Sequence, residues 1–522
     1  MPAEAPQADA GQNGLDITGI HYNSRTVEPG GLFVALAGFR TDGHEYIADA
    51  INRGAAAVAV DRRMITPVAT IQVPDTRQAL AVFADRFHGH PSREMTVIGI
   101  TGTNGKTTTS YLVENILAEA GINVGVIGTI NYRYGGKKID APVTTPESAD
   151  TQRLLRAMRE AGVTHVIMEA SSHALALNRL SGIEFDVGVF TNLTQDHLDF
   201  HKDMISYWEC KKRLFTDFLA AGSKKAKAAA VINMDDPRGA RLAGELNLPV
   251  VTVGHASQNR VHPVEVMFGP SGMTGRIRLD ADMSGHGAGD VAIESSLTGE
   301  YNLENILCAA GVGLALGMDP ETIGRGINAT RSVPGRLESI ENTAGIHVFV
   351  DFAHTPDALE NALKNLKKTV GGRLICIAGC GGDRDRAKRP QMAGIAVRLC
   401  DLSIFTSDNP RSESPMAIIE DMLTGIHNGY RAFSRADLSG SLESPGYVVE
   451  PDRRKAIVLG INVARAGDTV LIAGKGHETY QIIADQRISF DDRLEATAAL
   501  SKKAAGSAGA MNAGRMNQHE RL

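Results

Sequence analysis

Residues 98–109 read IGITGTNGKTTT, and this stretch decides how the chain folds. The β-branched run MTVIGI at 95–100 predicts a strand, and TTTSYLVENILAEAG at 107–121 carries apolar residues at helical spacing. A strand, a tight glycine turn and a helix in this order point backbone N–H groups at an anion. Gly-Lys-Thr here indicates a nucleotide phosphate, although Ile100 stands where the usual loop has its first glycine. The stretch therefore predicts an ATP site in a shortened loop.

Each residue type in the loop suits phosphate binding. Gly102 and Gly105 allow the turn, and Lys106 can reach the terminal phosphates. A hydroxyl of Thr107 or Thr108 can bind Mg²⁺. The alternative is an ordinary glycine-rich turn, which the specific Gly-Lys-Thr-Thr-Thr run makes the weaker interpretation. The predicted ATP-binding loop comprises Gly102, Thr103, Asn104, Gly105, Lys106, Thr107 and Thr108.

Outward from the loop, strand and helix patterns alternate along nearly the whole chain. Strand-like runs recur in THVIMEAS, FDVGVFTN, KAAAVINMDD, RLICIAGCGGDRD, LSIFTSDNPR and DTVLIAGKGHE. This alternation predicts an α/β fold with parallel sheets. Breaks at HGHPSREMT and SVPGRLESI divide the chain into predicted domains at 15–90, 91–335 and 336–503. The small, polar segments 1–14 and 504–522 predict disordered tails.

The composition favours a globular protein that acts on small molecules. Hydrophobic residues make up 43% of the 522 residues, and the net charge of -6 offers no basic field for nucleic acid. No apolar run reaches membrane-spanning length, and the N-terminus lacks the features of a signal peptide. Five scattered cysteines favour a reducing compartment. We therefore expect a cytoplasmic monomer with no nucleic-acid partner and no membrane span.

The loop TGTNGKTTT resembles the ATP loop of the Mur ligases and of their folylpolyglutamate synthetase relatives. The resemblance continues in order through NSRTVEPGGLFVAL, TTP, MEASSHAL, TNLTQDHLDFH, YWECKKRLF, GEYNLENILCA, VPGRLE, DFAHTPDAL, GGDRDRAKRP, DNPRSE and GKGHE. Members of this family are ATP-dependent enzymes that form amides. The resemblance implies a UDP-substrate domain, a central P-loop-type ATPase domain with a parallel sheet, and a Rossmann-like domain that binds an amino acid.

The resemblance also implies a reaction in peptidoglycan biosynthesis. Meso-2,6-diaminopimelate would be added to the D-glutamate γ-carboxylate of UDP-N-acetylmuramoyl-L-alanyl-D-glutamate. ATP turns the carboxylate into an acyl phosphate that the amine attacks, so the protein must neutralise charge and align the reactants. ATP is a co-substrate and Mg²⁺ the expected cofactor. The alternatives are a lysine-adding ligase, a folylpolyglutamate synthetase-like ligase and a non-catalytic ATP-binding regulator.

Four residues are expected to assemble a metal site. Glu169 and His197 each follow a predicted strand, so both lie near carboxyl ends of parallel strands, where α/β proteins bind ligands. The resemblance implies that they bind Mg²⁺, with Thr107 supporting the ATP-side ion. It also implies that Lys211 is carbamoylated to N6-carboxylysine and binds metal, which requires a neutral, desolvated amine. A solvated helix face is the alternative for Lys211. The expected catalytic residues are Lys106, His197, Lys211 and Arg336.

Further ATP contacts are expected from a helix and from the third domain. Asn302 and Asn305 are three residues apart and share a helix face. The resemblance implies that they contact adenine, with amide solvation as the alternative. Arg336 lies at a domain joint, where it could reach ATP phosphate on closure. Asp351 and His354 in DFAHTPDAL match ATP contacts of the family.

The UDP-muramoyl substrate is expected between the first and central domains. The positions that match the family are Ser24, Arg25, Thr144, Thr145, Ser171 and Arg179. Leu177 and Asn178 depart from the pattern, because a longer polar pair often precedes this arginine in the family.

The segment DNPR at 408–411 predicts which amino acid is added. Meso-diaminopimelate has a distal carboxylate and ammonium, whereas lysine has only the ammonium. Arg411 can hold that carboxylate bidentately, while Asp408 and Glu478 can accept from the ammonium. A surface salt bridge is the alternative for Arg411. The expected diaminopimelate-binding residues are Arg384, Asp408, Asn409, Pro410, Arg411, Gly474 and Glu478.

Overall fold

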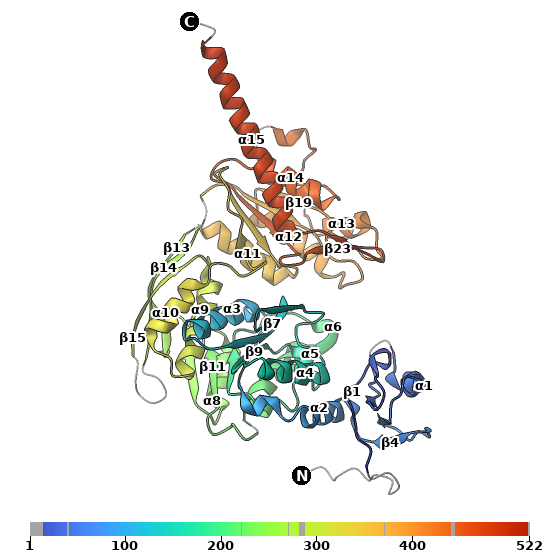
Figure 1. The fold of residues 1–522 in the computed structure, drawn as a ribbon. Helices are drawn as coiled ribbons and strands as arrows, with labels where there is room; N and C mark the ends of the chain where they lie inside the picture. Colours follow the sequence, from blue (N-terminus) through green and yellow to red (C-terminus); the bar gives the residue numbers. More distant parts are fainter. Residues whose placement is uncertain are drawn as a thin grey trace.

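Three β-sheets of four or more strands follow one another along the chain, and each carries its own helices (Figure 1). The computed structural model describes residues 14–519, except 39–40, 221, 270, 281–287, 370, 428 and 440–443. Apart from Gly14, the tail expected at 1–14 lies outside the described residues. Because the helices lie between consecutive strands, the α/β class predicted from the sequence is confirmed.

The first sheet is small and entirely parallel, in the order β1-β2-β3-β4. Leu80 and Ala84 of the second helix share a buried cluster with Ala149 of the central domain, and this packing attaches the first domain to the central one. The elements are β1 (Ile20–His21), β2 (Leu32–Val34), β3 (Ala57–Val60), β4 (Ala69–Gln72), α1 (Ile47–Asn52) and α2 (Thr76–Phe87).

The central sheet has eleven strands in the order β15-β14-β13-β12-β11-β10-β5-β9-β6-β7-β8. The six inner strands from β12 to β6 are parallel, as the alternating pattern predicted. Antiparallel strands extend both edges, which the sequence analysis did not foresee. The strands are β5 (Thr96–Thr101), β6 (Val124–Ile127), β7 (Asn131–Tyr134), β8 (Lys137–Asp140), β9 (His165–Glu169), β10 (Val187–Phe190), β11 (Ala229–Asn233), β12 (Val250–Val253), β13 (Val261–Gly269), β14 (Gly272–Leu279) and β15 (Gly289–Ser295).

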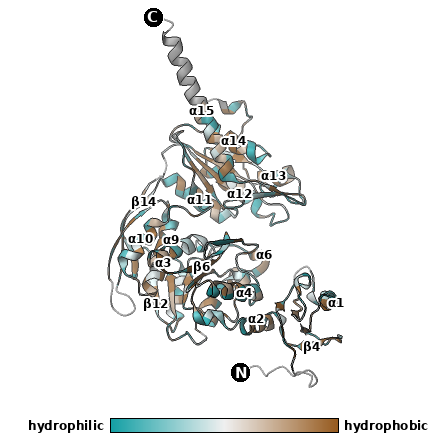
Figure 2. Cartoon of the chain, in the orientation of Figure 1, coloured by the Kyte–Doolittle hydropathy of each residue, from teal (hydrophilic) through white to brown (hydrophobic). Residues whose placement is uncertain are grey.

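Helices cover both faces of the central sheet, so its inner strands are buried apolar runs. Helices α3, α9 and α10 pack on one face, and α4, α5 and α7 pack on the other. Figure 2 shows hydrophobic residues gathered inside these layers. The helices are α3 (Lys106–Glu119), α4 (Ser148–Glu160), α5 (Ser172–Ala176), α6 (Leu198–His201), α7 (Met204–Arg213), α8 (Pro237–Glu245), α9 (Glu300–Ala315) and α10 (Pro320–Ala329).

The third domain contains a seven-stranded sheet in the order β16-β17-β22-β18-β19-β21-β20, and all of its strands except β16 run parallel. Helices α11, α12 and α13 cover one face, while α14 and α15 cover the other. The strands are β16 (Glu338–Ser339), β17 (His347–Asp351), β18 (Leu374–Ala378), β19 (Leu402–Phe405), β20 (Arg431–Ala432), β21 (Gly446–Val449), β22 (Thr469–Ala473) and the separate hairpin β23 (Tyr480–Ile483) and β24 (Gln486–Ser489). The helices are α11 (Pro356–Thr369), α12 (Lys388–Leu399), α13 (Pro415–Leu423), α14 (Arg453–Val463) and α15 (Asp492–His519).

Helix α15 continues beyond residue 503, where the sequence analysis placed the start of a tail, and projects from the third domain (Figure 1). Alanine is frequent in this stretch, and its high helix propensity accounts for the extended helix. Residues 520–522 of that tail lie outside the described part of the chain. In the described ranges, the structure contains no helix with the length and apolar character needed to span a membrane.

Candidate active site

A cavity of about 1960 Å³ lies between the central and third domains. Its walls include the glycine loop from Thr103 to Thr108, the carboxyl ends of central strands and the N-terminal part of α9. The third domain contributes the loop after β17 and the segment after β22. The cavity therefore lies at the sheet edge where the sequence analysis expected ligands to bind.

Glycine is required at two positions of the nucleotide loop. At Gly102, where φ is 151°, an added Cβ would lie 1.9 Å from Thr191 Oγ1. At Gly105, where φ is 85°, it would lie 2.2 Å from Asn305 Oδ1. Both positions combine a left-handed backbone with a close neighbour, so the loop can pass between β10 and α9 only with glycine there.

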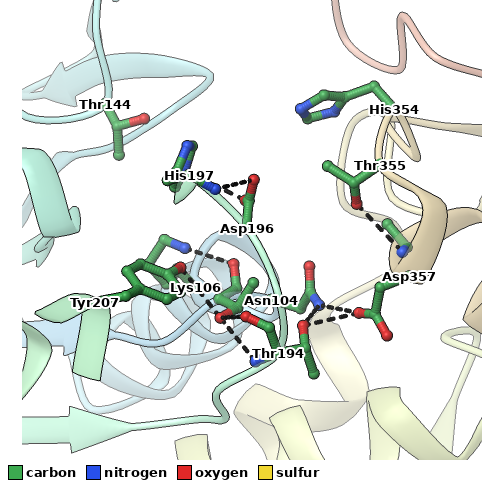
Figure 3. A network of polar contacts seen from close by, with 12 residues as sticks. Asn104, Lys106, Thr144, Thr194, Asp196, His197, Tyr207, His354, Thr355 and Asp357 are labelled. Atoms are coloured by element: carbon green, nitrogen blue, oxygen red, sulfur yellow. Dashed lines mark hydrogen bonds and ion pairs between the residues drawn. The ribbon is translucent and has the colours of Figure 1, made fainter. Parts of the chain in front are cut away.

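Lys106 begins α3 and bends back over its own loop (Figure 3). Its Nζ donates to the carbonyl oxygens of Gly102, at 2.7 Å, and Thr103, at 2.8 Å. Burial lowers the pKa of Lys106 from its ordinary value. Tyr207 Oη lies 3.1 Å from Thr103 Oγ1 and supports the loop from α7. The ammonium is thus held at the N-terminus of α3, where an anion is stabilised.

Glu169 ends β9 with its carboxylate buried beside the loop. It accepts hydrogen bonds from Thr107 Oγ1 at 2.9 Å, from Thr129 Oγ1 at 2.7 Å and from Thr129 N at 3.0 Å. These bonds fix an acidic group next to the helix that carries the nucleotide loop. The expected position of Glu169 at a strand end agrees with this geometry.

His197 lines the cavity, and its backbone has a left-handed conformation with φ at 54°. Its ring centroid is 4.9 Å from that of His173, and its Nε2 is 3.3 Å from Asp196 Oδ2. Desolvation, the largest cause, lowers the pKa of His197 to about 4, so the ring is neutral at pH 7. Among the described residues, no three His, Cys, Asp or Glu side chains form a ready metal cluster. Glu169 and His197 nevertheless line the same cavity.

Lys211 is buried, which excludes the solvated helix face considered from the sequence. Its Nζ donates to Gly102 O at 2.7 Å and lies 4.5 Å from the centre of the Tyr207 ring. Burial, followed by the nearby Lys106 cation, lowers the pKa of Lys211 well below its ordinary value. An amine in this environment favours its neutral form, the form that a carbamate requires.

The two asparagines of α9 occupy different positions. Asn305 lines the cavity, whereas Asn302 is buried behind it and accepts from Asn305 Nδ2 at 3.1 Å. Asn302 in turn donates to Thr298 O at 2.9 Å. Only Asn305 is therefore placed to contact a nucleotide in this structure, while Asn302 orients it.

Arg336 brings the joint of the third domain to the nucleotide loop. Its Nη2 donates to Thr107 Oγ1 at 3.3 Å, and its guanidinium lies 4.8 Å from the centre of the Phe352 ring. Asp351 and His354 line the same wall. Asp351 accepts from the backbone N of Leu337 at 2.6 Å, which leaves its carboxylate anchored at the joint.

The central-domain residues expected to bind the UDP substrate lie together. Thr145 Oγ1 donates to Ser171 Oγ at 3.1 Å, and Arg179 Nη1 donates to Thr145 O at 3.0 Å. Arg179 also pairs with Glu147 at 2.9 Å. The cavity-lining members of the set are Thr144, Thr145, Ser171 and Arg179.

Ser24 and Arg25 lie on the first domain, outside this cavity. Ser24 is buried, and the backbone N of Arg25 donates to Asn23 Oδ1 at 3.1 Å. The first domain reaches the central one through Arg77, whose Nη1 lies 3.3 Å from Glu147 Oε1. The structure therefore does not bring Ser24 and Arg25 together with the other expected UDP residues.

The residues expected to bind the amino acid divide into two groups. Arg411 has φ at 51°, and its Nη1 donates to Gly382 O at 2.8 Å and to Asn409 O at 3.4 Å. Within the described part of the chain, Arg411 forms no ion pair with a carboxylate. Arg384 and Glu478 line the cavity, whereas Asp408, Asn409, Pro410, Arg411 and Gly474 lie beside it.

Lys475 is a buried residue that the sequence analysis missed. Its Nζ donates to Glu478 Oε2 at 2.8 Å and to Asn409 Oδ1 at 3.1 Å, and lies 3.8 Å from Asp408 Oδ1. The ammonium compensates the two carboxylates that were expected to bind the distal ammonium of the substrate. Its position between two glycines in GKGHE was the only signal in the sequence.

The fold and the cavity define a class of protein: an enzyme of three α/β domains whose nucleotide-phosphate loop opens between two of them. Three family models match in chain order, the Mur ligase family catalytic domain at 16–88, the Mur ligase middle domain at 100–313 and the Mur ligase glutamate ligase domain at 335–476. The chain belongs to the Mur ligase family. It is an ATP-dependent ligase that forms amide bonds.

Two similar relatives carry the same name, UDP-N-acetylmuramoyl-L-alanyl-D-glutamate--2,6-diaminopimelate ligase. The protein from Geobacter metallireducens is 49% identical, over 96% of this chain and 98% of its own. The protein from Gloeobacter violaceus is 45% identical, over 94% and 95%. Both alignments span nearly the full length of each protein.

Solved structures agree with the fold. A structure of a UDP-N-acetylmuramoyl-L-alanyl-D-glutamate--2,6-diaminopimelate ligase is 32% identical, with a TM-score of 0.65 and coverage of 93% of this chain and 95% of its own. MurF ligase from Thermotoga maritima, solved in complex with ADP, has a TM-score of 0.60 at 18% identity, and covers 94% and 99%. The second similarity concerns the fold alone.

Proposed function

We propose that the chain adds meso-2,6-diaminopimelate to the D-glutamate γ-carboxylate of UDP-N-acetylmuramoyl-L-alanyl-D-glutamate, using ATP. The near-full-length identity of 49% to a relative named for this reaction carries the proposal. The geometry supports it, because the nucleotide loop lines the same cavity as Arg384 and Glu478, two of the residues expected to bind the amino acid. The regulator alternative is disfavoured, since the loop lysine, Glu169, His197 and Lys211 are all present.

The reaction needs two transfers at one carboxylate. The γ-phosphoryl group first moves from ATP to the substrate carboxylate, which gives ADP and an acyl phosphate. The amine then attacks the acyl carbon, phosphate leaves and the amine loses a proton. Lys106 and Arg336 offer positive charge at the loop for the phosphoryl oxygens. Asn305 is placed to orient the nucleotide from α9.

Mg²⁺ fits the donor set on the cavity wall. Glu169 supplies a fixed carboxylate, His197 a neutral ring and Lys211, once carbamoylated, a second carboxylate. The two carboxylates supply the oxygen ligands that Mg²⁺ prefers, and the histidine adds one nitrogen. When bound, the ion would reduce the repulsion between the phosphate and the substrate carboxylate. Thr107 lies between Glu169 and Arg336, so its hydroxyl can support the ion on the ATP side.

Amino-acid dependence of phosphate release tests the proposal. The purified chain should release phosphate from ATP with the UDP-muramoyl dipeptide and meso-diaminopimelate, and much more slowly with L-lysine or L-glutamate. Preference for lysine would select the lysine-adding alternative, and glutamate addition to a folate would select the folylpolyglutamate synthetase-like one. No amino-acid-dependent turnover at all would support a regulator. We further propose a cytoplasmic monomer, in keeping with its nucleotide substrates.

Lys211→Ala is expected to lower turnover about 100-fold, because a metal-binding carboxylate is lost next to the loop. Short carboxylic acids such as acetate should partly restore the rate by entering the vacated space, whereas bicarbonate should not. Phosphate release measures both effects. Lys212→Ala is the matched control, since this neighbouring lysine pairs with Glu245 at 2.5 Å on the surface. Full activity of the Lys211→Ala enzyme would contradict the proposed metal-binding role of Lys211.

A further inference from the structure

One carboxylate on the first helix of the third domain contacts the nucleotide loop of the central domain (Figure 3). Asp357, in the first turn of α11, accepts from Thr194 Oγ1 at 2.8 Å and from Asn104 Nδ2 at 3.1 Å. Asn104 Nδ2 also lies 3.2 Å from Thr194 Oγ1, so the three side chains form one network. Asn104 belongs to the nucleotide loop and Thr194 to the segment after β10, whereas Asp357 belongs to the third domain.

Both partners of Asp357 are fixed to the central domain. The backbone N of Asn104 donates to Asn192 Oδ1 at 2.9 Å, and the backbone N of Thr194 donates to Thr103 Oγ1 at 3.0 Å. Asp357 itself is half-buried and forms no ion pair with a cation among the described residues. A carboxylate without a cationic partner gains its compensation from these two donors, so the contact favours one position of α11 over the loop.

Asp357 does not line the cavity, although Thr355 and Ala358 on either side of it do. It is therefore placed to act on the site through the position of the domain, without touching a substrate. Helix α11 packs against α12, which follows Arg384, so the same domain carries the amino-acid site.

We propose that Asp357 is a positioning residue that sets the distance between the amino-acid site and the nucleotide loop. The inference rests on the proposed function, in which the third domain delivers an amine to an acyl phosphate formed at the loop. Reacting atoms must approach to about 3–3.5 Å, and a displacement of about 1 Å costs about 100-fold in rate. Because Asp357 fixes α11 directly against the nucleotide loop, it controls the distance between the amino-acid site and that loop.

Asp357→Ala is expected to lower kcat about 10- to 100-fold, with the KM for ATP changed less than about threefold. The midpoint of thermal unfolding should stay within the range of the wild type. Glu360→Ala is the matched control, because this carboxylate on the same helix pairs with Lys364 and Arg398 inside the third domain. The control should keep the wild-type kcat.

A double-mutant cycle tests the contact itself. Thr194→Val removes one donor and keeps the side-chain volume, so its effect on kcat should be much smaller in the Asp357→Ala background than in the wild type. Thr194→Val and Glu360→Ala should combine additively. Additive effects of Thr194→Val and Asp357→Ala on kcat would overturn the proposal.

Small-angle scattering of the ligand-free enzyme gives a readout that does not depend on the reaction. Asp357→Ala should increase the radius of gyration, because the third domain samples more positions, whereas Glu360→Ala should not. An unchanged radius together with wild-type kcat would overturn the inference. Failure of the wild-type chain to use meso-diaminopimelate would instead contradict the proposed function, and the scattering result would still decide whether Asp357 fixes the domain.

Discussion

Lys106→Ala is expected to lower ATP-dependent phosphate release about 10²–10³-fold, because a cation aimed at the transferring phosphoryl group is lost. The ammonium is held by the carbonyl oxygens of Gly102 and Thr103 at the N-terminus of α3. Phosphate oxygens would offer it stronger, charge-assisted partners. The fold should persist, since the glycine loop keeps its backbone contacts with β10.

The measurement is single-turnover formation of ADP with saturating UDP-muramoyl dipeptide, together with the midpoint of thermal unfolding. Lys367→Ala serves as the matched control, because Lys367 lines the same cavity from α11 but donates to Leu399 O at 3.1 Å, away from the loop. The control should keep its rate within about twofold. ADP formation by Lys106→Ala at the wild-type rate would contradict the ATP-loop assignment.

The conformation of the glycine loop was predictable because local chemistry determines it. Gly102 and Gly105 need left-handed backbones, and the strand before them and the helix after them each have a clear apolar pattern. Glu169 was placed at a strand end by the same reasoning, and the structure has it at the end of β9. Each of these inferences depends on a segment of fewer than about 30 residues. The rule that ligands bind at the carboxyl ends of parallel strands could therefore be applied directly.

Contacts between distant segments could not be read from the sequence. Asp357 and Asn104 are 253 positions apart, and only the docking of two domains brings them together. The burial of Lys475 likewise depends on how the segment after β22 packs on the DNPR turn. The antiparallel edges of the central sheet were missed for a different reason, since β13 is mostly exposed or half-buried and β14 mixes buried with exposed residues, so both lack a continuous apolar run.

Arg411→Ala is expected to lower kcat/KM for meso-diaminopimelate on the order of 10⁴-fold, the penalty typical of a site that loses its partner for a buried polar group. Glu478 is already paired with Lys475. Its carboxylate therefore attracts the ammonium of the substrate less strongly than an unpaired carboxylate would. Among the described residues, the side chain of Arg411 donates only to the backbone carbonyl oxygens of Gly382 and Asn409. Its positive charge is therefore available to the distal carboxylate, the group that lysine lacks.

The expected loss appears in the amino-acid dependence of phosphate release, with the KM for ATP changed little, because the nucleotide loop is in another domain. Arg386→Ala is the matched control: this exposed arginine pairs with Asp421 at 2.9 Å. Near-normal use of meso-diaminopimelate by Arg411→Ala, or equal use of L-lysine by the wild type, would contradict the role of Arg411. Both variants remove one cation from the third domain, but of the two arginines only Arg411 lacks a carboxylate partner among the described residues. The comparison therefore separates the recognition of a carboxylate from a general loss of positive charge.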